Sequence, residues 1–262
     1  MEKLKNYARE NIAYWSKRAP GYSDVNQQEL ASDQKTVWSQ VLFQQIMKHY
    51  KGKQPEELKV LDIGTGPGFF AIILTKMGFS VTAVDYTENM LKEAYRNAGD
   101  VAEDISFYKM DAMDLAFPDD TFDVIVSRNL TWNLPDPKEA YRQWTRVLKP
   151  GGLLLNFDAN WYRYLYDDTA MDSHLQDREN VARTAVEDDT AGTDVAAMEA
   201  IARKAPLSAK ERPMWDEKVL GSFGMSVLAD TDIWKTVWTT AERVNNASTP
   251  MFLIQAVKSV VS

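Results

Sequence analysis

The sequence predicts an α/β fold built on an open, mostly parallel sheet of seven strands. From Leu58 onward, short apolar runs alternate with segments of helical periodicity, which is the pattern of strand, crossover helix and parallel strand. A glycine-rich turn, VLDIGTGPGFF at 60–70, follows the first apolar run and opens the first of these helices. Two further apolar runs end the chain with a polar stretch between them, which indicates an antiparallel hairpin at one edge of the sheet.

The first fifty residues are predicted to be helical. Between Asp33 and Tyr50 the apolar residues recur at the three-and-four spacing of an amphipathic helix, so one face should pack on a larger body. They are Val37, Val41, Leu42, Phe43, Ile46 and Met47. Gly52 and Pro55 mark the boundary that follows. We therefore expect residues 1–52 to form an N-terminal helical cap.

Residues 58–157 should contain the cofactor-binding core of the sheet. The predicted strands are 58–64, 80–85, 105–111, 122–127 and 153–158. The predicted crossover helices are 69–78, 87–99 and 137–148. The last of these begins with a capping Asp136, a proline in the first turn and Glu139 three residues past the cap.

The alternation stops after the fifth strand. Residues 160–213 contain helical stretches such as 193–205 and are predicted to form a helical lid inserted into the fold. Residues 214–224 follow as a further crossover helix, and 225–238 and 251–260 are predicted to be two long strands that pair with each other. The chain 1–262 is thus expected to be one domain whose last part, 214–262, contributes a helix and two strands.

Composition and charge exclude several classes of function. The 262 residues carry 30 basic and 38 acidic side chains, a net charge of -8, with no dense basic cluster, which disfavours nucleic acid as a partner. The chain has no cysteine and only two histidines, His49 and His174, which excludes thiolate nucleophiles and Cys- or His-rich metal sites. No segment approaches the about 18 to 20 apolar residues that span a bilayer, so we expect a cytoplasmic protein, either monomer or homodimer.

The glycine-rich turn has an acidic partner at the end of the next strand. Asp85 lies 21 positions after Gly64, where a carboxylate can accept hydrogen bonds from the ribose hydroxyls of a nucleoside. A dinucleotide fingerprint needs a third glycine at position 69, which is Phe69 here, and the turn lacks the Gly-Lys-Ser or Gly-Lys-Thr ending of a phosphate P-loop. The turn therefore favours a small, partly anionic adenosine cofactor at a helix N-terminus.

Five ordered motifs resemble those of a known family, the class I S-adenosylmethionine-dependent methyltransferases, and within it the UbiE-like, methyltransferase type 11 group. The motifs are VLDIGTGPGFF, AVDYTENML, DAMDLAF, FDVIVSRNLTWNLPDP and RVLKPGG, and the resemblance covers residues 58–157. It implies a Rossmann-like fold and S-adenosyl-L-methionine as cofactor. It also implies transfer of a methyl group to an oxygen, nitrogen or carbon atom of a small molecule.

The resemblance implies a cofactor-binding role for twelve residues of the core. They are Asp62, Gly64, Thr65, Gly66, Gly68, Asp85, Tyr86, Met90, Asp111, Ala112, Met113 and Arg128. By this match Asp62 and the glycine turn would face the methionine portion, and Asp85 would accept from both ribose hydroxyls. Tyr86 and Met90 would flank the adenine, and Asp111 would accept from its exocyclic amine while the next backbone N–H reaches a ring nitrogen.

The N-terminal segment YWSKRAPGYS, residues 14–23, resembles the entrance segment of the same group. This match implies that Tyr14, Arg18 and Tyr22 close over the methionine end of the cofactor.

Several alternatives remain open at this point. Arg128 either lines the transfer site, where it pairs with an anionic substrate group or the cofactor carboxylate, or forms a structural ion pair. His174 is a weak candidate for a catalytic base, and the sequence shows no unambiguous one, so we expect metal-independent transfer by proximity and orientation. The aromatic run 161–166 is either a hinge of the insertion or a wall of the substrate pocket.

Two other functions compete with methyl transfer. One is a nicotinamide-dependent oxidoreductase, against which Phe69 argues. The other is a non-catalytic protein that uses the same fold to sense the cofactor or to bind a partner.

Overall fold

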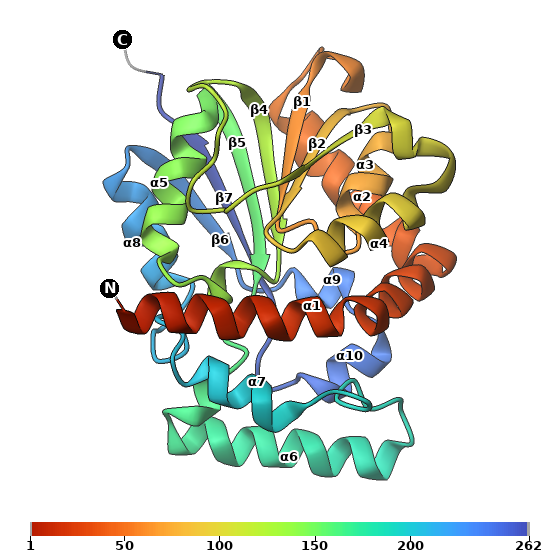
Figure 1. The fold of residues 1–262 in the computed structure, drawn as a ribbon, viewed down its shortest axis with the longest axis vertical. Coiled ribbons are helices and arrows are strands. Elements are labelled where there is room, and N and C mark those ends of the chain that lie inside the picture. Colours follow the sequence, from red (N-terminus) through yellow and green to blue (C-terminus); the bar gives the residue numbers. More distant parts are fainter. Residues whose placement is uncertain (1, 261–262) are drawn as a thin grey trace.

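Seven strands form one sheet in the order β3-β2-β1-β4-β5-β7-β6 (Figure 1). The structure is a computed structural model that describes residues 2–260, with side chains from residue 6 onward. The strands are β1 (Lys59–Ile63), β2 (Ser80–Asp85), β3 (Ile105–Lys109), β4 (Phe122–Arg128), β5 (Leu148–Asp158), β6 (Met225–Asp230) and β7 (Phe252–Lys258). Only β7 runs antiparallel to its neighbours, β5 and β6, so the predicted fold class is confirmed.

The strand order reverses between β1 and β4. From β1 the chain proceeds outward through β2 to β3, and it then returns to the other side of β1 as β4. In open α/β sheets ligands bind at such a switch point, outside the carboxyl ends of the strands. The order of the strands therefore places the expected site at the ends of β1, β2 and β4.

Both faces of the sheet are buried because successive strand residues point to opposite sides. Val60 and Val124 belong to one core cluster, whereas their neighbours Leu61 and Ile125 belong to the other. The first cluster packs against α2 (Asp33–His49), α3 (Phe69–Lys76) and α4 (Glu88–Ala98). The second packs against α5 (Pro137–Val147) and α8 (Met214–Ser222), as Figure 1 shows.

Helices α5 and α2 are among those that begin at caps the sequence provides. At α5 the side chain of Asp136 accepts from the backbone N–H of Glu139, with Pro137 in the first turn, as predicted. At α2 the side chain of Ser32 accepts from the N–H of Gln34. The cap at Ser32 also separates α2 from α1 (Glu2–Ala31), so the helical N-terminal region consists of two helices.

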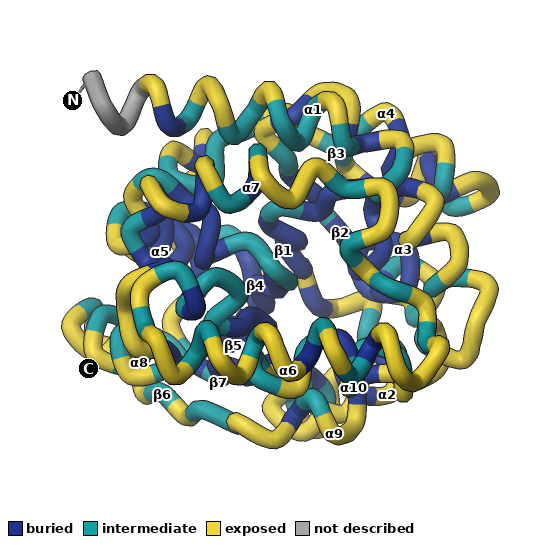
Figure 2. Tube along the Cα trace, turned by 90° about the horizontal axis from the view of Figure 1, so that it is seen from below, coloured by how far each residue is buried: buried dark blue, intermediate teal, exposed yellow. Residues whose placement is uncertain are grey.

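Helix α1 lies across the carboxyl ends of the strands, and the segment after β5 lies beyond it (Figure 1). This segment contains α6 (Asp168–Thr184) and α7 (Val195–Ala202), so its predicted helical character is confirmed. Helix α7 lies beside α1 (Figure 2), where Met198 and Ile201 share a buried apolar cluster with Tyr7 and Trp132. The insertion is therefore packed against α1.

The prediction of one long strand over residues 225–238 was wrong. Strand β6 ends at Asp230, whose side chain accepts from the N–H of Asp232 and so turns the chain. Two short helices follow, α9 (Trp234–Val237) and α10 (Thr240–Asn245), the latter with a Thr-Glu capping box. Ile233, Val237 and Trp238 recur at helical spacing and are buried in the cluster that contains α2, which accounts for the helix.

Strand β5 is also longer than predicted, since it begins at Leu148 rather than 153. No helix within residues 2–260 combines the length and the apolar character needed to cross a membrane.

Candidate functional site

Two adjoining cavities lie at the switch point of the sheet, beneath α1. The large cavity encloses about 990 Å³, part of it open to solvent, and the small cavity about 300 Å³. They share Tyr22, Gly64, Gly66 and Arg128, so they form one continuous site with two compartments.

Gly64 and Gly66 of the glycine turn line both compartments, whereas Gly68, also predicted to bind the cofactor, lines neither. Gly64, Gly66 and Gly68 have φ angles of 69°, 53° and 95°, which favour glycine. A Cβ on Gly64 would lie 2.6 Å from Leu130 Cδ2, and one on Gly68 would lie 3.0 Å from Ala94 Cβ. Both the backbone conformation and the close packing therefore require glycine here, and they let the main chain approach a ligand.

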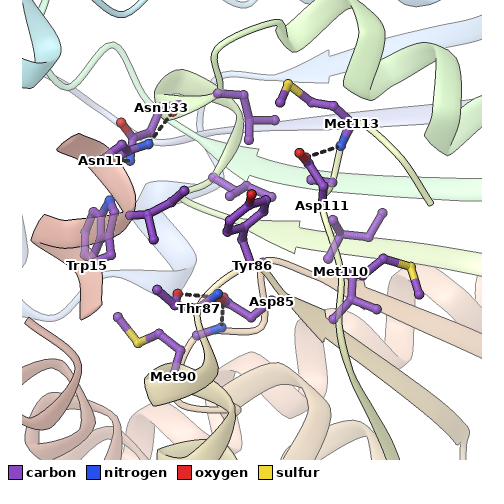
Figure 3. Close-up of a pocket in the computed structure, with 18 of the residues that line it drawn as sticks. Asn11, Trp15, Asp85, Tyr86, Thr87, Met90, Met110, Asp111, Met113 and Asn133 are labelled. Atoms are coloured by element: carbon purple, nitrogen blue, oxygen red, sulfur yellow. Dashed lines mark hydrogen bonds between the residues drawn. The ribbon is translucent and has the colours of Figure 1, made fainter. Parts of the chain in front are cut away.

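Asp85 ends β2 at the edge of the large cavity. Its Oδ1 accepts from the N–H and hydroxyl of Thr87, and its Oδ2 accepts from the N–H of Gly66 at 3.0 Å (Figure 3). These bonds fix the carboxylate, while its four lone-pair sites leave capacity for a further donor. Burial raises the pKa of Asp85, and the hydrogen bonds from Thr87 and Gly66 oppose that rise.

Asp111 lies on another wall of the large cavity, directly after β3. Its Oδ1 accepts from the N–H of Met113 at 2.8 Å, and the carbonyl of Ala112 accepts from Trp144 Nε1 at 2.9 Å. Trp144 is fully buried on α5, so it fixes this turn from behind. Burial raises the pKa of Asp111, as does the nearby charge of Asp114.

Between these carboxylates the cavity has an apolar lining. Tyr86 extends into the space between Asp85 and Asp111, and the methionines lie around it (Figure 3). These methionines are Met90, Met110 and Met113. Such an environment suits a flat heterocycle held between flexible side chains.

Helix α1 supplies a wall of the large cavity, of which the sequence interpretation predicted only Tyr22. Ala8, Asn11, Ile12, Trp15 and Tyr22 line it. Their three-and-four spacing was a signal in the sequence, but it identifies a buried face and not what lies beneath it.

Three residues hold α1 against the segment that follows β4. Asn11 and Asn133 exchange side-chain and backbone hydrogen bonds of 2.9 and 3.0 Å, and the hydroxyl of Tyr7 donates to the carbonyl of Asn133 at 2.9 Å. We call Tyr7, Asn11 and Asn133 the α1 latch. The latch lies at the rim of the large cavity, so it couples the position of α1 to the shape of the site.

The small cavity lies beside the start of α3. Asp62 of β1 lines it and is only 2% exposed. Its Oδ2 accepts from the hydroxyl of Thr65 at 2.7 Å and from the N–H of Ala71 at 3.1 Å. Desolvation raises the pKa of Asp62 to about 7.

Arg128 lines both compartments and forms an ion pair with an acid of α1. Its two terminal nitrogens donate to the two carboxylate oxygens of Glu29 at 2.8 and 2.9 Å. The guanidinium also lies 4.8 Å from the ring centroid of Phe69 and near the rings of Trp38 and Phe70. Of the two roles left open, the structure shows the paired arginine, placed within the site.

Other predicted site residues lie elsewhere. Tyr14 packs on Trp15, the guanidinium of Arg18 lies over Gly21, and neither Tyr14 nor Arg18 is among the residues that line the two cavities. His174 of α6 stacks on Tyr164 with 3.9 Å between ring centroids and is likewise absent from the lining. Among the described residues of the insertion, 160–213, none lines either cavity.

Further lining residues come from the ends of strands and from the segment after β4. They are Ile63, Val84, Thr87, Asn129, Leu130, Asn133, Leu134 and Pro135. The stretch 129–135 directly follows a central strand. This position, at the edge of the sheet where ligands bind, could have identified it from the sequence as part of the site.

Comparison with known proteins gives matches to methyltransferases over the core of the chain. Residues 61–156 match the family model described as a methyltransferase domain. The chain is 35% identical over 106 residues to the ubiquinone biosynthesis O-methyltransferase of Caulobacter sp. (strain K31), covering 40% of this chain and 42% of the relative. It is 36% identical over 98 residues to the demethylmenaquinone methyltransferase of Clavibacter sepedonicus, covering 37% and 39%. The match thus spans about two fifths of the length of these curated relatives.

The fold comparison extends over nearly the whole chain. A Methanococcus maripaludis structure, provisionally described as an S-adenosyl-L-methionine-dependent methyltransferase, superposes with a TM-score of 0.57 at 19% identity, covering 94% of each chain. Residues 61–156 thus match a methyltransferase domain, and the superposition and the strand order show that the chain as a whole has the class I methyltransferase fold.

Proposed function

We propose that the protein binds S-adenosyl-L-methionine in the two-compartment site and transfers its methyl group to a small-molecule acceptor. One observation supports this most strongly: Asp85 and Asp111 are fixed on separate walls of one cavity whose floor is the glycine turn. That arrangement suits a nucleoside, which presents hydroxyls at one end and an exocyclic amine at the other. The oxidoreductase alternative also uses an adenosine cofactor, and Phe69 in place of the third glycine of a dinucleotide fingerprint argues against it.

The residues present fit the proposed cofactor. Asp85 would accept from a ribose hydroxyl at the lone pair that Thr87 and Gly66 leave free, with Tyr86 and Met90 at the adenine. Asp111 would accept from the exocyclic amine through its Oδ2, because its Oδ1 is occupied by the N–H of Met113. The small cavity would take the amino-acid end, beside Asp62 and the glycine turn.

The cofactor would supply a methyl group on a positively charged sulfur, and the protein would orient the acceptor and exclude water. Alignment of this kind contributes about 7 to 11 kcal/mol to well-placed reactions. Helix α1 covers the site, and the insertion 160–213 packs on α1, so we propose that both act as a lid on a single domain. We assign no dedicated base and no metal to the reaction.

We propose a small, uncharged and largely apolar acceptor. Ile12, Trp15, Leu130 and Leu134 line the α1 side of the large cavity, and none of them carries a charge. The names of two relatives, which refer to ubiquinone biosynthesis and to demethylmenaquinone, are consistent with such a molecule.

Calorimetric titration tests cofactor binding. S-adenosylmethionine and S-adenosylhomocysteine should both bind the wild type, and Asp85→Ala should weaken each by about 10- to 100-fold, since hydrogen bonds to a charged group are lost. Asp24→Ala, which removes an exposed carboxylate of α1, is the matched control and should bind as the wild type does. Absence of binding to the wild type would refute the proposed function.

Turnover is tested with S-adenosylmethionine labelled on its methyl group and a panel of hydroquinones, phenols and small amines, in the presence of a chelator. We expect label in an uncharged, apolar member of the panel. Cofactor binding without label in any acceptor would favour the cofactor-sensing alternative.

A further inference from the structure

Of the charged side chains around the small cavity, Arg128 forms an ion pair with another residue of the part that the structure describes, and Asp62 does not. Arg128 donates both terminal nitrogens to Glu29, and the two side chains are only 13% and 16% exposed. The guanidinium fork, which is the usual receptor for a carboxylate, is therefore already occupied by a carboxylate of the chain itself. Glu29 also neutralises the charge of Arg128 where the cavity begins.

Asp62 has no such partner. It is almost fully buried, and both of its hydrogen bonds reach Oδ2, from Thr65 and Ala71. In the part of the chain that the structure describes, Oδ1 accepts no hydrogen bond, and no lysine, arginine or histidine forms a salt bridge with Asp62. The charge of Arg128 favours ionised Asp62 without forming a salt bridge to it, and it does not offset the cost of burial, so a cationic ligand group would stabilise the carboxylate.

Asn26 adds a second acceptor from α1. It lines the small cavity, is 1% exposed, and donates through Nδ2 to Glu29 at 3.3 Å. Its Oδ1 is buried and accepts nothing among the described residues. Buried amide oxygens normally have a donor, so this atom is a second place for an N–H of a ligand.

We propose that the small cavity recognises the amino-acid end of its ligand by the ammonium group, which Asp62 and Asn26 accept, while Glu29 withholds Arg128 from the ligand carboxylate. The inference rests on the proposed function, because it concerns the amino-acid end of the same cofactor. It assigns Asn26 and Glu29, two residues of α1, to ligand specificity. It also makes α1 part of the binding site itself and not only a cover.

Calorimetry with four ligands on the full chain tests this proposal. The ligands are S-adenosylhomocysteine, its decarboxylated analogue, its deaminated analogue and 5′-methylthioadenosine. The decarboxylated analogue, which keeps the ammonium, should bind within about 3-fold of S-adenosylhomocysteine. The deaminated analogue, which keeps the carboxylate, should bind about 10- to 100-fold more weakly, close to methylthioadenosine.

Glu29→Gln supplies a readout that structural damage does not imitate. The substitution leaves Arg128 with an uncompensated charge, so the deaminated analogue should bind at least about 5-fold more tightly than it binds the wild type, and the decarboxylated analogue more weakly. Loosened packing would weaken both analogues together. Asn26→Ala should reduce the preference for ammonium, and Gln28→Ala, an exposed neighbour on α1, should leave it unchanged.

The opposite ranking of the two analogues in the wild type would overturn the proposal, because Arg128 would then serve the carboxylate. Equal affinity of all four ligands would overturn it too, since the amino-acid end would not be recognised, yet it would leave the proposed function intact. Failure of all four ligands to bind would reject the proposed function along with it.

Discussion

Asp62 is the residue at which ligand binding and fold stability oppose each other. Desolvation raises its pKa in the folded protein from 3.8 to about 7. A raised carboxyl pKa means that the folded state holds its proton more tightly than the unfolded state does, so this group lowers stability as pH rises from about 4 through 7. At 1.36 kcal/mol for each pKa unit, the cost above pH 7 reaches about 4 kcal/mol.

Asp62→Asn should therefore stabilise the ligand-free protein at pH 8. The amide oxygen can still accept from Thr65 and Ala71, while the buried charge is gone. We expect a gain of about 1 to 3 kcal/mol in the free energy of unfolding at pH 8, and little change at pH 4. Denaturant titration at both pH values measures this, and a loss of stability at pH 8 would contradict the assigned cost of the buried carboxylate.

The raised pKa of Asp62 also predicts that ligand binding depends on pH. A ligand ammonium favours ionised Asp62, so binding lowers its pKa and the affinity for S-adenosylhomocysteine should rise about 10-fold between pH 6 and pH 8. Calorimetry in matched buffers checks this. The Asp62→Asn variant should bind S-adenosylhomocysteine more weakly, and its affinity should not change between pH 6 and pH 8. A wild-type affinity that falls between pH 6 and pH 8 would contradict the prediction.

For single residues, the sequence predicted those whose backbone conformation is fixed by a local motif. Gly64, Gly66, Asp85 and Asp111 were predicted to bind the cofactor, and all four line the large cavity, because glycine conformations and strand ends are local properties. The Glu29–Arg128 pair was not predictable, since the two residues are separated by 99 positions and only the fold brings them together.

At the scale of elements, α1 is the least expected part of the site. Its cavity-lining face repeats at helical spacing, yet a helical face in a sequence does not say which neighbour it contacts. The N-terminal entrance segment predicted Tyr14, Arg18 and Tyr22, and of these only Tyr22 lines the cavities.

Tyr7→Phe tests the α1 latch without changing a residue that lines the cavity. The substitution removes the hydroxyl that donates to Asn133, which costs about 1 kcal/mol and leaves a buried acceptor with one partner fewer. Amide hydrogen exchange in the first turns of α1 should become about 5-fold faster, while exchange in β1 stays unchanged.

Tyr95→Phe is the matched control, because Tyr95 is half-exposed on α4 and its hydroxyl bonds to Glu103 away from α1. If amide hydrogen exchange in α1 is as slow in the Tyr7→Phe variant as in the wild type, the α1 latch does not hold the helix.

The element α9 shows where local patterns mislead. Residues 225–238 contain strand-like apolar residues, but Asp230 turns the chain, and Trp234 to Trp238 then bury a helical face against the cluster of α2. The tertiary contact decides between strand and helix here, and that contact cannot be read from a short segment alone.

At the scale of the whole molecule, one buried ion network joins the parts of the fold around the site. Arg212, at the end of the insertion, donates to Asp158 of β5 at 2.7 Å and to Asp216 of α8 at 2.8 and 2.9 Å. Asp158 also accepts from the N–H of Trp132, in the segment after β4. The network therefore links the insertion and α8 to the strand ends that form the site.

Arg212→Ala should destabilise the protein by about 3 to 5 kcal/mol, because two buried carboxylates lose their shared cation. Denaturant unfolding checks this. Arg142→Ala, which breaks the surface pair with Glu139, is the matched control and should cost no more than about 1 kcal/mol. Equal effects of the two substitutions would mean that the buried network contributes no more than a surface pair.

The central claim is that one site beneath α1 binds S-adenosylmethionine through Asp85, Asp111 and the glycine turn. A crystal structure with S-adenosylhomocysteine tests it most directly. We expect a ribose hydroxyl on Asp85, the adenine between Tyr86 and Met90 with its amine on Asp111, and the amino-acid end in the small cavity. A ligand bound outside these two cavities, or bound with its adenine away from Asp111, would contradict the account.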